Sequence, residues 1–498
     1  MDNFFLLIMG FLIYLMQAGF AFLEAGAVRS KNTVNILIKN ALDTFFGGIS
    51  YWIMGYAFAF GKGNSFIGFT HFAHSGLPET KYAHWFFQFV FAATASTIVS
   101  GAIAERCDFI AYTIYSVLIT GFIYPVVTHW VWSAEGWLAT GRTYQIDGEA
   151  VTVTYSVRDF AGSSVVHMVG GISAFVGAWA MGPRIGRFDN HTGKPIEIRG
   201  HSIPFASLGG FILVFGFFAF NGSSQGSISN PGDGSAIAVA VTNSVLAASG
   251  GAFTTMLMNK TKFFGDQKWS YLTALNGCLT GMVAICAGCN QFRTYIAFIT
   301  GILGGVSYMC FTWLVLKLRI DDPLDAAAVH FGGGFVGVLS VPFFSHRYGI
   351  VYHWNLKSAY HLAWQLAGGA SIFAWVATLS FILFFSLKKL HILRVPFEYE
   401  LKGLDIPKHG ETAYPSEAYG HGWGEKGDTL VGLVRDATKT CLKVMGPNEV
   451  RINIAERARP GESPEVDAIR NTKNGQVNKG FNRSDDDAAT CGPMTSHL

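Results

Sequence analysis

The chain has 498 residues, of which 50% are hydrophobic, 15% are aromatic and only 14% are charged. Soluble domains carry about 25% charged residues, so this composition excludes an ordinary soluble protein and indicates a protein of the lipid bilayer. The net charge of +3 is too small to suggest nucleic-acid binding, and no nucleic-acid partner is expected.

Eleven hydrophobic segments are long enough to cross a bilayer, which takes roughly 20 residues. We therefore predict an all-α polytopic membrane protein with eleven transmembrane helices. Abundant glycine within the segments favours close helix packing in lipid. The first segment is expected to be retained, because no basic stretch precedes it as in a cleavable signal peptide. The predicted spans are 4–24, 34–60, 85–104, 109–131, 160–182, 202–224, 234–258, 270–287, 294–316, 326–344 and 359–387.

Basic residues concentrate in the loops that follow the odd-numbered spans, for example Arg29 and Lys31 after the first and Lys388 after the last. Loops rich in Lys and Arg stay on the cytoplasmic side. The N-terminus is therefore predicted outside and the C-terminus in the cytoplasm. The predicted domains are a transmembrane domain over 1–388 and a cytoplasmic tail over 389–498.

The tail is expected to contain three parts. Residues 397–425 are rich in Tyr, His, Trp and Gly and are expected to dock on the cytoplasmic face. Residues 429–445 have the pattern of one amphipathic helix. From about residue 459 the composition is polar and predicts disorder.

Two charged residues lie inside the second predicted span. Lys39 and Asp43 are four residues apart, so they are predicted to pair on one helix face in a structural role. Lys39 also lies near the cytoplasmic end of the span, where it can reach the interface.

Two stretches place an aspartate and a histidine in otherwise small or apolar sequence. The first runs from Asp159 to His167 and is followed by two glycines, and the second runs from Asp325 to His330 and is followed by three. Ionisable residues within membrane spans are costly and default to a functional interpretation. A histidine satisfied by packing is the alternative, and the matched contexts favour function.

The two stretches enter the membrane from opposite sides in the predicted topology. Spans one to five and six to ten are therefore expected to form an inverted five-plus-five repeat, with one extra helix at the end. His167 is expected near the middle of the bilayer, about 12 Å below Asp159. We therefore expect the functional site at the midplane of the bilayer, between the two halves of the repeat.

The chemistry of this site depends on neutral imidazoles. Loss of water disfavours the imidazolium form, so His167 and His330 are expected to be neutral and to share a proton. Asp159 precedes a helix and is expected to cap it. It is also expected to add negative potential near the outer mouth, whereas a direct ligand role is the less favoured alternative.

Aromatic residues near the predicted outer face supply a possible cation site. Trp132 ends the fourth span, and Phe91 and Phe220 lie in Phe-rich stretches. Ring faces attract a small cation by about 0.5–2 kcal/mol, and the hydroxyl of Ser224 could accept a hydrogen bond from it. By periodicity alone these aromatics would be core or interface residues.

Cofactor chemistry is not expected. The seven cysteines lie mostly in apolar runs, and the pair Cys286 and Cys289 lacks the second pair that a zinc site needs. Catalytic zinc takes three protein ligands, and no third ligand accompanies His167 and His330. We predict no metal, no cofactor and no enzymatic activity.

These residues resemble a known family, the ammonium transporter (Amt/Mep/Rh) superfamily, and its Amt branch in particular. The resemblance rests on the stretch MQAGFAFLEAG from Met16, VSGAIAER from Val99, the stretch from Asp159 to Gly171, GPRIGRF from Gly182, and DDPLD from Asp321. It covers nearly all of the predicted membrane domain. It implies an eleven-span fold, assembled as a plasma-membrane homotrimer with one pore in each subunit.

The resemblance also implies residue roles. His167 and His330 would be the twin histidines of the pore, and Phe91 and Phe220 the phenylalanine gate. Ammonium would be recruited at Trp132, Phe91, Ser224 and Asp159. The insert at 141–157, between Trp132 and Asp159, departs from the family pattern.

The resulting hypothesis is an ammonium transporter of NH4+ or NH3, with methylammonium as an analogue. Ammonium would be recruited outside, deprotonated at the gate, and passed as ammonia along a twin-histidine apolar pore. Two alternatives stay open, a passive ammonia gas channel and an ammonium sensor that signals through the cytoplasmic tail.

Overall fold

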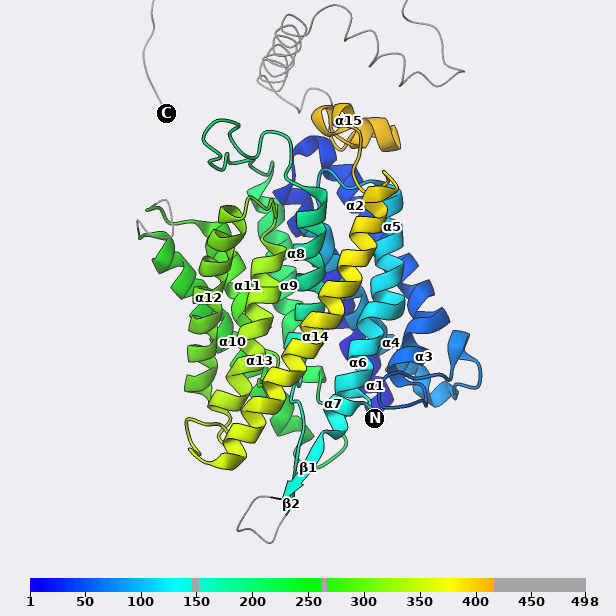
Figure 1. Cartoon of the computed structure of the whole chain (residues 1–498), viewed down its shortest axis with the longest axis vertical. Helices are drawn as coiled ribbons and strands as arrows, with labels where there is room; N and C mark the ends of the chain where they lie inside the picture. The colour runs from blue at the N-terminus through cyan, green and yellow to red at the C-terminus, as the bar shows by residue number, and fades with distance from the viewer. Residues whose placement is uncertain (146–151, 262–266, 416–498) are drawn as a thin grey trace, which may run out of the picture. The chain divides into compact units, whose positions relative to one another are not determined.

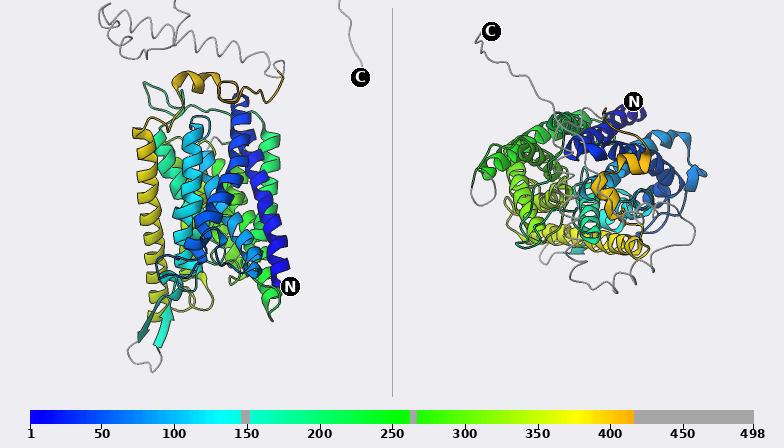
Figure 2. Two further views of the ribbon diagram at one scale, coloured as in Figure 1. Left: turned by 90° about the vertical axis from the view of Figure 1, so that its right-hand side faces the viewer. Right: turned by 90° about the horizontal axis from the view of Figure 1, so that it is seen from above.

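The computed structural model describes residues 1–145, 152–261 and 267–415. Long helices run side by side between two ends of the molecule (Figure 1). One end carries the strands β1 (Arg142–Gln145) and β2 (Thr152–Tyr155), and the other carries α15 (Phe397–Lys402). The N-terminus lies at the strand end (Figure 2). These are called the strand end and the α15 end.

Several helices are interrupted by π-helical turns. These turns and the short 3-10 helices share the label η. In chain order the further elements are α1 (Asp2–Ala27), η1 (Ser30–Asn32), α2 (Thr33–Ser50), η2 (Tyr51–Gly55), α3 (Tyr56–Phe60), η3 (Phe72–His74), η4 (Glu79–Lys81), α4 (Tyr82–Ala102), α5 (Phe109–Leu118), η5 (Ile119–Ile123), α6 (Tyr124–Trp132), α7 (Trp137–Thr140), η6 (Ser163–Met168), α8 (Val169–Met181), α9 (Ile203–Ser223), α10 (Asp233–Asn259), α11 (Tyr271–Ile285), α12 (Thr294–Lys317), η7 (Ala327–Gly332), α13 (Gly333–Phe344), α14 (Leu356–Lys389) and η8 (Asp405–His409).

The architecture is that of a helical protein with many membrane spans, as predicted. Within the described ranges, nine helices are long and apolar enough to cross a membrane. Two predicted spans are not among them. The span predicted over 34–60 corresponds to α2, η2 and α3, and that over 270–287 corresponds to α11, which has only 15 residues. The count of eleven spans stays a prediction.

The prediction of an all-α fold is wrong for one stretch. Within the 141–157 insert, β1 and β2 form an antiparallel pair in which Arg142 lies opposite Tyr155 and Gln145 opposite Thr152. Alternating residues such as Thr, Val and Tyr favour an extended chain. The stretch is short and lies between long helical segments, so its pattern did not change the predicted fold class.

Helices α1 and α9 pack antiparallel along their length. At the strand end the carboxylate of Asp2 accepts from the backbone of Ile228 and Ser229, beyond the end of α9. At the α15 end the backbone of Ser202 donates to Gly26. The contact requires glycine, since a Cβ on Gly209 would lie only 2.1 Å from the backbone nitrogen of Leu23. The short separation explains why glycine is frequent within the spans.

The expected pairing of Lys39 with Asp43 is wrong. The ammonium group of Lys39 donates to the carbonyl oxygen of Cys107 at 2.8 Å. The carboxylate of Asp43 accepts instead from Tyr112 at 2.6 Å and from Ser96 at 3.2 Å. Residues four apart on a helix can meet, but partners on α4, α5 and the loop between them satisfy these two side chains separately.

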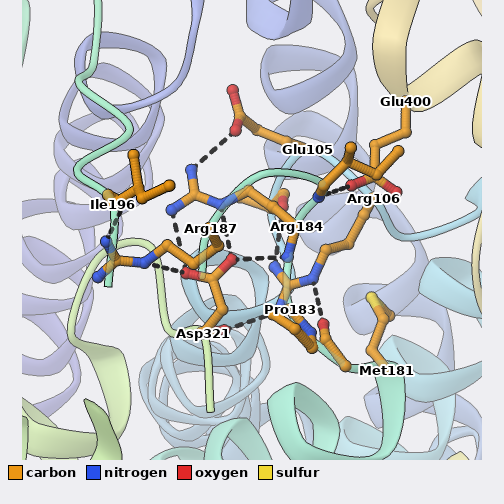
Figure 3. A network of polar contacts seen from close by, with 12 residues as sticks. Glu105, Arg106, Met181, Pro183, Arg184, Arg187, Ile196, Asp321 and Glu400 are labelled. Atoms are coloured by element: carbon orange, nitrogen blue, oxygen red, sulfur yellow. Dashed lines mark hydrogen bonds and ion pairs between the residues drawn. The ribbon is translucent and has the colours of Figure 1, made fainter. Parts of the chain in front are cut away.

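Ion pairs join four loops at the α15 end. Figure 3 shows the guanidinium of Arg184 between the carboxylates of Glu105 and Asp321, at 2.8 Å from each. Arg29 and Arg187 complete the cluster through Glu105 and Asp321, respectively. The loops after α1, α4, α8 and α12 are thereby held together.

The charges of this cluster control the protonation of its carboxylates. Burial by itself would raise the pKa of Glu105, but the charges and hydrogen bonds of Arg29 and Arg184 outweigh it and lower the pKa to about 2. The pKa of Asp321 is likewise lowered: burial opposes the shift, and Arg106 and Arg184 outweigh it. Both groups are therefore carboxylates at neutral pH.

The described part of the tail packs on the α15 end. Asp405 accepts from the backbone of Asn35 at the start of α2, and Lys408 pairs with Asp108 at 2.8 Å. Farther on, His201 shares a hydrogen bond with Tyr414. The amphipathic helix predicted over 429–445 and the disorder predicted from residue 459 lie outside the described residues.

Candidate functional site

Two π-helical turns carry the two histidines and run in opposite directions. His167 lies in η6, which leads into α8, and His330 lies in η7, which leads into α13. The elements are antiparallel, because Arg184, just after α8, pairs with Asp321, just before η7. At the strand end, Ser163 accordingly lies beside α13, where it would meet a Cβ on Gly337.

The glycines after each histidine let these two elements touch. A Cβ on Gly171 would lie 2.2 Å from the backbone nitrogen of Phe331. A Cβ on Gly334 would lie 2.5 Å from the carbonyl oxygen of Ser163. Backbone cannot move away as a flexible side chain can, so both positions require glycine. The shared spacing of histidine and glycine therefore reflects a crossing of two helices at the histidines.

The two imidazoles lie against each other at this crossing. Nδ1 of His167 is 3.2 Å from Nδ1 of His330, and the ring centroids are 5.2 Å apart with the planes inclined by 19°. One nitrogen must carry the hydrogen and the other must accept it. His167 is fully buried and His330 is 7% exposed. Nε2 of His167 has no hydrogen-bond partner among the described residues.

A file of aromatic rings leads to this pair. Trp132 is partly exposed and meets Phe91 edge to face, with centroids 5.8 Å apart. Phe91 contacts Phe220 at 4.4 Å, and Phe220 contacts His167 at 5.4 Å. Phe91 and Phe220 are at most 1% exposed. The five rings, with His330 last, are contributed by α6, α4, α9, η6 and η7.

Asp159 fixes the start of η6. Its two carboxylate oxygens accept from the backbone nitrogens of Gly162, Ser163, Ser164 and Val165 and from the hydroxyl of Ser164, at 2.6–3.0 Å. Its carbonyl oxygen accepts from the indole of Trp132 at 2.8 Å. The side chain therefore caps the turn that carries His167, and its backbone orients the outermost ring of the file.

Ser224 lies at the end of α9, one helical turn beyond Phe220. Its hydroxyl donates to the carbonyl oxygen of Phe220 at 2.8 Å, and the side chain is partly exposed. The donor is thus occupied, whereas the oxygen lone pairs can accept a hydrogen bond. Ser224 is linked to the ring file through Phe220.

Two neighbours of the histidines were not found from the sequence. Phe217 stacks on His167, with centroids 5.5 Å apart and planes inclined by 25°, and Phe20 lies 6.5 Å from His330. Phe217 precedes Phe220 by nearly one helical turn, so helical spacing could have placed it on the same face. Phe20 comes from α1, and no local pattern joins it to His330.

A cavity of about 30 Å³ lies beside His330 on the side away from the file. It is called the His330 cavity, and its wall includes Phe20, Glu24, Phe217, Asn276, Leu324 and His330. Its size suits a molecule of about the dimensions of water. Glu24, which is only 2% exposed, was also missed, although a lone glutamate in an apolar span is itself a signal.

No cluster of three or more His, Cys, Asp or Glu side chains arranged to hold a metal occurs in the described part of the chain. Cys286 and Cys289 are buried free thiols. The site is therefore built from aromatic rings, two imidazoles and apolar walls.

Comparison with known proteins gives a consistent result. The model of the Ammonium Transporter Family matches residues 4–414. The chain is 48% identical to putative ammonium transporter 1 of Caenorhabditis elegans, over 85% of this chain and 80% of the relative. It is 38% identical to ammonium transporter 1 member 3 of Solanum lycopersicum, over 82% and 92%.

Solved structures agree with this assignment. A sensor Amt protein is 32% identical and superposes with a TM-score of 0.73, over 82% of this chain and 98% of that one. Mep2 of Candida albicans, at 24% identity and a TM-score of 0.70, has the same fold over 84% of this chain and 93% of that one. The chain belongs to the ammonium transporter family.

Proposed function

We propose that the chain moves ammonium by recruiting the ion at the Trp132 end of the ring file and passing it onward as ammonia. The observation that carries the proposal is the unbroken contact from Trp132 through Phe91 and Phe220 to His167 and His330. An arriving cation first meets the partly exposed ring of Trp132. The transported molecule meets the two buried imidazoles last.

Recruitment uses ring faces and one hydroxyl. Trp132 and Phe91 attract the ion by about 0.5–2 kcal/mol, and Ser224 accepts a hydrogen bond from it. Asp159 acts indirectly, since both of its carboxylate oxygens already cap η6. It positions Trp132 and His167 and adds negative potential at this end.

Deprotonation at the gate, with the proton released to water outside, explains how ammonium is separated from potassium. The two ions are similar in size and charge, so ring faces alone separate them poorly. A charged guest between Phe91 and Phe220 loses its water and gains only the weak attraction of two ring faces, whereas neutral ammonia does not incur this cost. Beyond the gate, Nε2 of His167 offers ammonia a hydrogen-bond partner. Potassium has no proton to lose and is excluded.

The membrane arrangement completes the proposal. Eleven spans form an inverted five-plus-five repeat with one extra helix, with the strand end outside and the α15 end in the cytoplasm. The antiparallel pairing of α1 with α9 supports the repeat, and so does that of α8 with α13. These are the first and sixth and the fifth and tenth predicted spans. We propose a plasma-membrane homotrimer in which each subunit has its own pore.

The test is methylammonium uptake by vesicles that contain the purified protein. We expect saturable uptake in the wild type and its loss in His167→Asp or His330→Glu, because a carboxylate would replace one neutral ring of the pair. Unchanged uptake in both variants would contradict the proposal.

The two alternatives give different outcomes. A passive gas channel would change the pH inside the vesicles when ammonia is supplied, without saturation by ammonium outside. A sensor would keep its flux after deletion of the tail, while the downstream response of the cell would disappear.

A further inference from the structure

Glu24 is a buried acid in the wall of the His330 cavity. It lies near the end of α1, and its side chain is 2% exposed. His330 lines the same cavity, together with Asn276 and otherwise apolar side chains. A guest that leaves His330 on the side away from Phe220 therefore meets one carboxyl group.

No ion pair to Glu24 occurs within the described residues. Oε2 accepts from the side-chain amide of Asn40 at 2.7 Å, and Oε1 contacts the hydroxyl of Ser100. The nearby cation Lys39 donates instead to the carbonyl oxygen of Cys107. A buried carboxylate without a cation is costly. Glu24 is thus stable either as a neutral acid or as the partner of a cation that arrives in the cavity.

The hydroxyl of Ser100 suits both forms of Glu24. It contacts Oε1 of Glu24 and also the carbonyl oxygen of Thr97, the latter at 2.6 Å. A hydroxyl has one hydrogen and can donate to only one of these. When Ser100 donates to Thr97, the carboxyl of Glu24 can donate to Ser100. When Glu24 is ionised, Ser100 rotates and donates to it.

We propose that Glu24 is the proton donor that converts ammonia back to ammonium in the His330 cavity. The bond between the carboxyl oxygen and its hydrogen breaks, and the lone pair of the ammonia nitrogen takes the proton. Ammonium then forms beside the new carboxylate. It leaves toward the α15 end, and Glu24 regains a proton from hydronium on that side. This inference rests on the proposed function, because it requires ammonia to reach His330.

The other ionisable groups near Glu24 are already engaged. On α2, Lys39 donates to Cys107, and Asp43 accepts from Ser96 and Tyr112. His330 on η7 shares its hydrogen bond with His167. The wall of the cavity contributed by α9 is apolar, and that from α11 offers only the amide Asn276. Asp325, between the wall residues Leu324 and Ala326, accepts from Tyr308 and Asn276. Among the described residues that line the cavity, Glu24 is therefore the one acid.

Glu24→Gln tests the proposal, because glutamine keeps the size of the side chain but cannot supply a proton. The full chain is placed in vesicles, and those with the tail inside are selected by removing vesicles that expose a tag after Leu498. Methylammonium uptake is then measured at fixed outside pH while the inside pH is varied. We expect wild-type uptake to depend on inside pH. Glu24→Gln should lose this dependence and be slower by about tenfold or more.

Two further variants keep the outcome interpretable. Glu24→Asp retains a carboxyl group and should keep the dependence on inside pH at a reduced rate, even if Glu24→Gln does not fold. Asp43→Asn removes a buried acid that does not line the cavity and should transport as the wild type does. Glu24→Gln with wild-type uptake and wild-type pH dependence would overturn the inference, as would Glu24→Asp without pH dependence. Wild-type vesicles with no uptake would instead contradict the proposed function.

Discussion

Nδ1 of His167 lies 3.2 Å from Nδ1 of His330, although the two residues are 163 positions apart in the chain. The contact exists because η6 and η7 cross where glycine follows each histidine. It leaves Nε2 of His167 buried and without a partner among the residues described.

The crossing should not tolerate a methyl group. In Gly171→Ala the new Cβ would meet the backbone of Phe331 at 2.2 Å, so the helices must separate. We expect a loss of about 1–3 kcal/mol in the free energy of unfolding, together with a large loss of methylammonium uptake. Gly234→Ala is the control, because nothing lies within 4 Å of its Cβ. Equal stability and uptake in the two variants would contradict the close crossing.

Asp159 should matter mainly as the cap of η6. Asp159→Ala leaves four buried backbone N–H groups without their acceptor. We expect a loss of about 2 kcal/mol or more in unfolding free energy, and loss of uptake because His167 moves. Asp189→Ala removes a carboxylate that accepts similar bonds in an exposed turn, and should cost less and leave uptake intact. Thermal unfolding measures the stability of the two variants, and methylammonium uptake measures their transport. A stable Asp159→Ala protein that fails only in transport would favour a direct ligand role.

The ion cluster should make stability depend on acid pH. The pKa of Glu105 is about 2 in the folded protein against an ordinary value of 4.5. A lowered pKa stabilises the fold above the ordinary value, and this contribution is lost as pH falls from about 4.5 through about 2. Unfolding measured across this range should show a steep decline in the wild type.

Glu105→Gln should reduce this loss of stability at acid pH. Glu105→Gln leaves Arg184 with one carboxylate fewer, and breaking a buried pair costs about 3–5 kcal/mol at neutral pH. Glu197→Gln is the matched control. Its partner Arg199 is 78% exposed and Glu197 is 70% exposed, so the loss should be under about 1 kcal/mol. Equal losses in the two variants would show that the cluster does not stabilise the loops.

Selectivity at the gate should depend on the aromatic ring of Phe91 and not only on the volume of its side chain. Phe91→Leu keeps an apolar side chain but removes one face of the 4.4 Å contact with Phe220. We expect the selectivity for methylammonium over potassium to fall, since water can then accompany a charged guest. Phe373→Leu is the control, because the Phe373 side chain on α14 is 45% exposed. Competition by potassium during methylammonium uptake measures the change, and unchanged competition would count against the gate.

The sequence was most informative where a motif is local. The Asp-to-His stretches and their glycines could be read directly, because capping, burial and close packing act within a few residues. The aromatic residues Phe91 and Phe220 could be placed only through the family resemblance, since Phe is common throughout the spans.

The remaining features depend on contacts between distant segments. Lys39 and Asp43 were expected to pair because helix spacing allows it, but Cys107, Tyr112 and Ser96 proved the better partners. The importance of Glu24 depends on a cavity closed by α1, α9, α11 and η7 together. Such assemblies have no periodicity in one segment, so a single sequence does not reveal them.

Comparing the fluxes of methylammonium and potassium through the same vesicles tests the central claim most directly. Both are monovalent cations that ring faces attract, but only methylammonium can lose a proton before the gate. We predict saturable methylammonium uptake with no potassium flux above that of empty vesicles, even with potassium in large excess. A potassium flux comparable to that of methylammonium would contradict passage as the neutral form.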